Sequence, residues 1–305
     1  MDRIGLKAFA KINLTLDVLG KRADGYHEVA MIMQGIDLHD TVWIEKRADR
    51  GVVLTCDHPD LAADSTNLVY RAAELILSRF PRICGAALHL YKRIPIAAGL
   101  GGGSSDAAAV LLGMNALFGL KISWETLLDY AAQLGSDVPF CLKPMISLAT
   151  GRGEIIQELS CGPSLWILLA KPPFTISTPK IYNHLHKVTV ATRPCLDEAL
   201  YALEKKDNAL LYGAMANVLE FPAFDLYPDL QKWAGEIEGL GADKVMMSGS
   251  GPTLMGFFKK EEDAKKAALL WNRPSWNVFI TRTIGLRDID GRMMEDGQQG
   301  AFYSG

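Results

Sequence analysis

The chain has 305 residues, of which 49% are hydrophobic and 22% charged, so it is long enough for one large or two ordinary globular domains. Its 32 Lys and Arg residues against 35 Asp and Glu residues leave no basic excess, which argues against nucleic acid or a membrane surface as a partner. Five scattered cysteines without a Cys-x-x-Cys pair disfavour a disulfide framework or a zinc site, and with neither a signal peptide nor a membrane-spanning apolar run we expect a cytoplasmic protein.

The N-terminal segment alternates apolar and polar residues over positions 4–18, and this period of two predicts a half-buried β-strand. Lys11 and Asn13 fall on the polar face, so the spacing alone favours a solvated strand lysine. A turn at Gly20–Gly25 is predicted to connect this strand to an antiparallel partner at residues 29–36.

Tyr26 and His27 stand at the mouth of that second strand. An aromatic ring and an imidazole at this position could stack on a planar ligand ring and form hydrogen bonds with it. Ordinary packing at a strand edge is the alternative, and the local sequence favours it. The elements predicted before the next motif are strands 41–46, 52–55 and 86–91 and a helix 65–78.

Four glycines fall within residues 99–103, two serines follow, and apolar residues then repeat with helical spacing from Ala107 to Phe118. Ser104 or Ser105 is predicted to cap this helix. A glycine-rich loop that enters a helix offers backbone N–H groups and the positive end of the helix dipole to an anion, so we predict a polyphosphate site. The loop lacks the Gly-Lys-Ser/Thr of a Walker A motif and the third glycine of the dinucleotide fingerprint. A flexible connector is the alternative interpretation.

Asp137 follows a predicted helix at 124–134, which Ser123 caps and Gly135 ends. The Val138-Pro139 pair after it favours extended or turn geometry. The local sequence is equally compatible with a reactive carboxylate and with a residue that only caps the next short helix.

The second half of the chain has a different element order, beyond a boundary predicted near residues 158–165. A strand, several helices, a hairpin, a helix and a last strand suggest a small split βαβ unit with an antiparallel sheet. A second glycine-rich turn, Ser248–Thr253, lies inside the hairpin, and from Arg287 the lack of periodicity predicts a poorly ordered tail. The predicted elements are strands 146–149, 165–170, 244–247, 254–258 and 277–281, a turn at 151–153, and helices 179–185, 195–204, 208–220, 229–238 and 261–271.

Three stretches, Ala10–Leu14, Pro95–Ala108 and Ser248–Thr253, together resemble the three motifs of the GHMP small-molecule kinases. Gly25–Glu28 and Gly135–Phe140 are similar to the branch of that family that acts on a cytidine diphosphate derivative of methylerythritol. The resemblance spans roughly residues 6 to 285, and its specificity comes from five motifs in the right order. It implies an α+β, two-domain GHMP kinase fold with ligands in the cleft between the domains. The implied parts are an N-terminal half like ribosomal protein S5 domain 2 (1–160), a ferredoxin-like C-terminal half (161–286) and a tail (287–305).

The resemblance also implies a reaction, the phosphorylation by ATP of the 2-hydroxyl of 4-diphosphocytidyl-2-C-methyl-D-erythritol in the non-mevalonate route to isoprenoid precursors. Its catalytic residues would be Lys11 and Asp137. ATP would be the phosphoryl donor and would act with Mg²⁺, for which no metal-ligating residue is assigned. The protein would act as a monomer or weak homodimer. The loop residues that would wrap the ATP phosphates are Pro95, Ile96, Ala97, Ala98, Gly99, Leu100, Gly101, Gly102, Gly103, Ser104 and Ser105. The residues that would hold the cytidine substrate are Asn13, Tyr26, His27, Thr178 and Tyr182.

Two alternatives stay open. Another kinase of the family could act on a mevalonate-type, homoserine or sugar substrate, although Gly25–Glu28 argues against this. A non-catalytic nucleic-acid-binding module is disfavoured by the slightly acidic balance and by the presence of both Lys11 and Asp137. The chain departs from the family pattern at Phe9, where proline is usual, and at Asp106, an acid that we expect to point away from phosphate or towards Mg²⁺.

Overall fold

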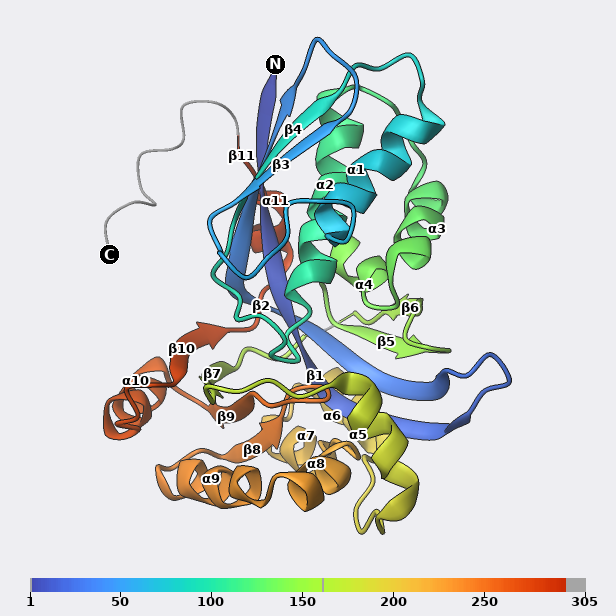
Figure 1. Ribbon diagram of the computed structural model, residues 1–305. Coiled ribbons are helices and arrows are strands. Elements are labelled where there is room, and N and C mark those ends of the chain that lie inside the picture. Colours follow the sequence, from blue (N-terminus) through green and yellow to red (C-terminus); the bar gives the residue numbers. More distant parts are fainter. Residues whose placement is uncertain (1, 161, 295–305) are drawn as a thin grey trace.

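The computed structural model describes residues 2–160 and 162–294 and contains one β-sheet in each half of the chain (Figure 1). The strands are β1 (Arg3–Lys21), β2 (His27–Lys46), β3 (Val52–Cys56), β4 (Ala86–Tyr91), β5 (Ser147–Thr150), β6 (Ile155–Glu158), β7 (Trp166–Lys171), β8 (Lys244–Met247), β9 (Leu254–Phe258), β10 (Asn277–Arg282) and β11 (Met293–Met294). The α-helices are α1 (Leu68–Arg79), α2 (Gly102–Leu117), α3 (Trp124–Leu134), α4 (Val138–Leu142), α5 (Thr178–His184), α6 (Leu196–Lys205), α7 (Asn208–Ala214), α8 (Glu220–Leu226), α9 (Pro228–Gly239), α10 (Glu261–Leu270) and α11 (Leu286–Asp290).

The N-terminal half is built on a seven-stranded sheet with the order β11-β1-β2-β4-β3, in which β5 pairs with β2 and β6 with β5. Helices α1 and α2 cover one face of this sheet, and α3 packs on these helices and on α4 (Figure 1). Strands β1 and β2 form a long antiparallel hairpin that continues beyond this layer towards the C-terminal half. The segments 29–36 and 41–46, expected as two strands, are parts of the single strand β2.

In strand β1 the alternation of side chains between the two faces of the sheet is interrupted. Its pairing with β2 shifts between Phe9 and Lys11 and again between Asn13 and Thr15, and a bulge reverses the face to which the following side chains point. The apolar residues on either side of these bulges pack in the core with α2, whereas Ala10, Ile12 and Leu14 between them pack in a second core with strands β7 and β9. Lys11 is therefore only 5% exposed and Asn13 is fully buried, so the solvated-lysine interpretation is wrong.

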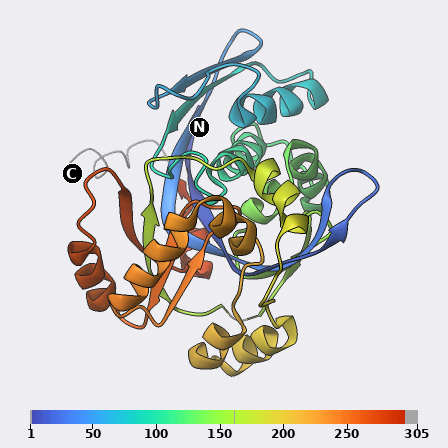
Figure 2. The same ribbon diagram turned by 60° about the horizontal axis from the view of Figure 1, so that its bottom comes forward.

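The C-terminal half holds a four-stranded antiparallel sheet with the order β10-β7-β9-β8. Numbered within this half, the order is 4-1-3-2, which is the split βαβ arrangement expected from the sequence. Helices α9 and α10 pack on this sheet (Figure 2). The expected helix 208–220 is instead two helices, α7 and α8, because the chain becomes extended at Met215 and Asn217 forms a bridge with Leu16 of β1.

The C-terminal segment returns to the N-terminal half. Residues 286–294 form α11 and β11, and β11 pairs antiparallel with β1 at Gly5 and Leu6. The prediction of a poorly ordered tail is therefore wrong for residues 287–294, and its remainder, 295–305, lies outside the described residues. Over the two described ranges, no helix combines the length and apolar character needed to cross a bilayer.

Candidate active site

A cavity of about 640 Å³ lies where the two halves meet. It collects side chains from distant parts of the chain: from β1, from the turn before β2, from the glycine-rich loop, from the start of α4 and from α5. Of the residues predicted to act in catalysis or substrate binding, the structure brings together on this cavity Lys11, Asn13, Tyr26, His27, Asp137, Thr178 and Tyr182.

Lys11 and Asp137 form an ion pair in this cavity, with 3.5 Å between Lys11 Nζ and Asp137 Oδ2. Lys11 Nζ also donates a hydrogen bond of 3.0 Å to Asn13 Oδ1, and Asn13 Nδ2 lies 3.1 Å from Met31 Sδ. Asp137 occupies the N-cap position of α4, but its side chain accepts no capping hydrogen bond there. Its carboxylate instead faces the lysine and the cavity, where it is partly exposed.

Three rings and a guanidinium line the same cavity. The rings of His27 and Tyr182 are 5.0 Å apart, and the guanidinium of Arg152 lies 4.9 Å from the centre of the Tyr26 ring. Burial, with a smaller effect of Lys21, lowers the pKa of His27, so its imidazole is favoured in the neutral form, which can both donate and accept a hydrogen bond. Burial and the nearby Asp137 raise the pKa of the Tyr182 phenol, which keeps its proton.

The glycine-rich loop borders a second cavity of about 560 Å³, lined by residues 95–104 together with Asn67, Lys92 and others. Gly99, Gly101 and Ser104 line both cavities, so a ligand in the second can extend into the first. Helix α2 begins at Gly102, after Gly101 in a left-handed conformation (φ 70°), and neither serine is its cap. Ser105 lines neither cavity: it is buried, and its hydroxyl donates a 2.5 Å hydrogen bond to the carbonyl oxygen of Phe9.

The second glycine-rich turn, Ser248–Thr253, packs on the first. Ser248 Oγ donates a 2.9 Å hydrogen bond to the carbonyl oxygen of Gly99, and Leu100 accepts one of 3.0 Å from the backbone N–H of Lys11. Ser250 Oγ lies 2.7 Å from Thr178 Oγ1. The three stretches that carried the family resemblance therefore touch one another around a single cavity.

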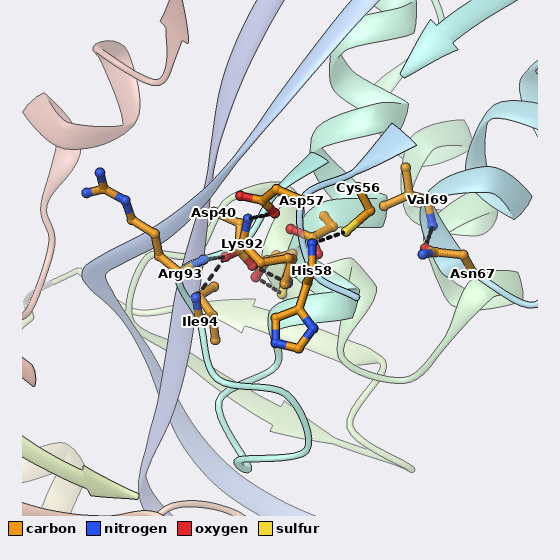
Figure 3. A network of polar contacts seen from close by, with 12 residues as sticks. Asp40, Cys56, Asp57, His58, Asn67, Val69, Lys92, Arg93 and Ile94 are labelled. Carbon is orange, nitrogen blue, oxygen red and sulfur yellow. Dashed lines mark hydrogen bonds and ion pairs between the residues drawn. The ribbon is translucent and has the colours of Figure 1, made fainter. Parts of the chain in front are cut away.

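The start of α2 is held by a buried charge cluster that the sequence did not reveal (Figure 3). Lys92 Nζ pairs with Asp40 and, at 2.7 Å, with Asp106, while Asp40 Oδ1 accepts hydrogen bonds from the backbone N–H groups of Arg93 and Ile94. Burial and the neighbouring Asp40 raise the pKa of Asp106. Asp106 thus anchors its helix to the strand end before the loop, and the expectation that it points away from phosphate or towards Mg²⁺ stays a prediction.

Comparison with known proteins agrees with this geometry. Residues 67–143 match the GHMP kinases N terminal domain, and residues 199–274 match the GHMP kinases C terminal domain. A 4-diphosphocytidyl-2-C-methyl-D-erythritol kinase of Macrococcus caseolyticus is 43% identical over 276 residues, which cover 90% of this chain and 98% of the relative. The protein of that name from Acetivibrio thermocellus is 44% identical over 284 residues, 93% of this chain and 100% of the relative.

The chain belongs to the 4-diphosphocytidyl-2-C-methyl-D-erythritol kinases, within the GHMP kinase family. A crystal structure titled 4-(cytidine 5'-diphospho)-2C-methyl-D-erythritol kinase superposes with a TM-score of 0.78 at 33% identity, covering 92% of this chain and 99% of the other. A homoserine kinase from Cytophaga hutchinsonii has a TM-score of 0.69 at 20% identity, over 93% of this chain and 95% of the other, and shares the fold. The α+β GHMP kinase fold implied by the resemblance is confirmed.

Arg152 and Lys92 are among the cavity residues that sequence reasoning missed. Arg152 lines the main cavity from the turn between β5 and β6, a turn that the sequence predicted without a functional role. Lys92 lines the second cavity, and its partners lie 52 and 14 positions away along the chain. Neither belongs to a local pattern, so only the fold brings them to the site.

Proposed function

We propose that this protein transfers the γ-phosphoryl group of ATP to the 2-hydroxyl of 4-diphosphocytidyl-2-C-methyl-D-erythritol, with Lys11 and Asp137 as its catalytic pair. The observation that carries the proposal is the Lys11–Asp137 ion pair, in a cavity that connects the glycine-rich loop to the Tyr26, His27 and Tyr182 pocket. One end suits polyphosphate and the other suits a planar base. The reacting hydroxyl would lie between them. We expect the protein to act in the cytoplasm as a monomer or weak homodimer on these small molecules, without nucleic-acid or membrane partners.

In this reaction the substrate oxygen forms a bond to the γ-phosphorus, the bond to the bridging oxygen breaks, and ADP leaves. Asp137 accepts the hydroxyl proton, since its carboxylate is partly exposed in the cavity and lies beside the ammonium of Lys11. Lys11 pairs with the Asp137 carboxylate and attracts the negative charge of the transferring group. Asn13 orients the Lys11 ammonium through its 3.0 Å hydrogen bond. Such a reaction depends more on placement and charge neutralisation than on covalent help from the protein.

The residues of the loop fit ATP and its magnesium ion. Among the residues that the structure describes, no group of three or more His, Cys, Asp or Glu side chains is arranged to hold a metal by itself. Mg²⁺ that arrives with a nucleotide takes most of its ligands from phosphates and water, so one or two protein oxygens suffice. Ser104 is an oxygen donor on the cavity shared with Gly99 and Gly101 and would hold it. When bound, the ion neutralises charge on the phosphates.

The cytidine end rests on a different set of residues. Tyr26 offers an exposed ring face, and Tyr182 supports the imidazole of His27, whose neutral form can read the polar edge of a cytosine. Thr178 comes from the same helix as Tyr182 and closes the cavity against Ser250. A pocket with these hydrogen-bonding groups would discriminate against alcohols that lack the base.

A coupled ADP-release assay with MgATP tests the proposal directly. It would compare 4-diphosphocytidyl-2-C-methyl-D-erythritol with mevalonate, homoserine and galactose, and we expect turnover only with the cytidine compound. Asp137→Asn is expected to lower kcat by at least about a hundredfold, the usual scale for a general base. Turnover with another alcohol alone would refute the substrate assignment, and near-normal turnover of Asp137→Asn would refute the base role.

The cytosine pocket has its own test. His27→Ala is expected to raise KM for the cytidine substrate far more than KM for ATP, because the imidazole lies in the main cavity and does not line the second one. Parallel titrations of the two substrates measure both constants. Equal increases would contradict the assignment of His27 to cytosine.

A further inference from the structure

Arg292 is a buried cation in the segment that joins α11 to β11. Its side chain is 3% exposed, although the sequence around it has no pattern that predicts burial. The segment is fixed on β1 by the antiparallel pairing of β11 and by a 3.0 Å hydrogen bond from the N–H of Lys7 to the carbonyl oxygen of Arg292. A guanidinium has been carried from the end of the chain into the interior of the N-terminal half.

The guanidinium connects two backbone segments. Arg292 Nε donates a 2.8 Å hydrogen bond to the carbonyl oxygen of Lys7 in β1, and Nη1 donates one of 2.9 Å to the carbonyl oxygen of Leu142, the last residue of α4. Leu142 ends a five-residue helix, so its carbonyl has no intrahelical partner and gains one here. A rigid planar fork that holds two carbonyls also fixes the distance between the elements that bear them.

These two elements carry the proposed catalytic pair. Lys11 lies four residues beyond Lys7 on β1, and Asp137 stands directly before α4, whose other end is held at Leu142. We propose that Arg292 is a positioning residue, which sets the separation between Lys11 and Asp137 by clamping β1 to α4; the proposal rests on the function assigned to that pair above. The C-terminal segment is thereby a working part of the active site.

The charges around Cys141 of α4 support this placement. Its thiol is within electrostatic reach of Asp137, Lys11 and Arg292, and burial raises its pKa to about 12, so it stays protonated. Burial lowers the pKa of Arg292 to about 10, a desolvation cost that the two carbonyls offset only in part. Because burial of this guanidinium costs free energy, its presence is better explained by the position that it gives to β1 and α4 than by a gain in stability.

The test compares two arginines that hold the same segment. Arg292→Met keeps an unbranched apolar stem in place of the arginine stem and removes both donors to the carbonyls. The control is Arg282→Met, because Arg282 of β10 binds Asp288 of α11 with contacts of 2.5 and 3.1 Å but does not touch β1 or α4 through the bonds above. We expect Arg292→Met to lower kcat about tenfold to a hundredfold with little change in either KM, as a displaced reacting group does. The control should lose stability only.

A double-mutant cycle separates positioning from other causes. If Arg292 acts through Asp137, Arg292→Met should cause no further loss of kcat in an Asp137→Asn background. Full additivity of the two losses, or an unchanged kcat in a destabilised Arg292→Met, would overturn the proposal. Near-normal turnover of Asp137→Asn alone would instead show that the base assignment fails. Should Arg292→Met not fold, Arg292→Lys keeps the charge but not the fork, and an undiminished kcat in that variant would equally refute the clamp.

Discussion

Replacing Gly99 by alanine would put a Cβ atom 2.1 Å from the carbonyl oxygen of Ser248, where an ordinary contact needs at least 3.4 Å. The neighbour is backbone, so one of the two glycine-rich turns must retreat by about 1.3 Å. Gly99 also has φ of +78°, which costs an L-residue about 1–2 kcal/mol. With about 1–3 kcal/mol for the overlap, Gly99→Ala should lower the free energy of unfolding by about 2–5 kcal/mol.

Gly103 provides the matched comparison within the same loop sequence. It lies in the first turn of α2 without positive φ, and a Cβ there would meet Leu68 Cδ1 at an ordinary 3.7 Å. Gly103→Ala should therefore raise stability by about 0.5–1 kcal/mol, since alanine loses less backbone entropy in a helix. Urea denaturation followed by tryptophan fluorescence measures both variants. Equal effects of the two changes would show that the contact between the turns does not determine the conformation of the loop.

Two further predictions concern buried charge. Lys92→Met should lower the free energy of unfolding by about 3–5 kcal/mol, because it leaves Asp40 and Asp106 buried without their cation. Adding Asp106→Asn should recover part of this loss in the same denaturation assay. A further loss of stability in the double variant would contradict the role of the cluster. Burial raises the pKa of Glu220 from 4.5 to about 7, so the folded state keeps a proton that the unfolded state releases, and stability should fall as pH rises through that window. Glu220→Gln should flatten this slope between about pH 5 and about pH 8. A slope equal to that of the parent protein would exclude Glu220 as its source.

Local sequence patterns were sufficient to predict those elements whose conformation depends on neighbouring residues alone. The helix after the glycines, the stop at Gly135 and the cap at Ser123 are present as predicted, because each depends on a few neighbouring residues. Lys11, Asn13, Tyr26, His27, Asp137, Thr178 and Tyr182 were predicted because each belongs to a short motif, and the structure places them together on the main cavity, whereas Arg152 of the same cavity was missed. Their roles remain predictions until the substitutions above are made. The division of the chain at residues 160 and 161 also remains a prediction.

The errors arose where distant contacts decide the outcome. The cap of α2 was expected at Ser104 or Ser105, but a left-handed Gly101 starts the helix earlier, and Ser105 is thereby turned to the carbonyl oxygen of Phe9. A helix was expected through residue 217, but Asn217 forms a bridge with β1 and donates to the carbonyl oxygens of Met247 and Gly249. In each case a tertiary hydrogen bond outweighs a weak local propensity.

The bulges of β1 show how such long-range effects reach the chemistry. An unbroken alternation would have put Lys11 opposite the core, on a solvated face, where an ammonium is screened and has little influence on a nearby carboxylate. The shifts at Phe9 and Asn13 turn this short stretch over, so that Lys11 is buried against Asn13 and Asp137. The bonds on either side of it, from Ser105 to Phe9 and from Arg292 to Lys7, hold the irregular strand to α2 and α4. A motif can therefore identify the lysine, but its burial against Asp137 depends on a backbone irregularity that segments nearly a hundred and nearly three hundred residues away keep in place.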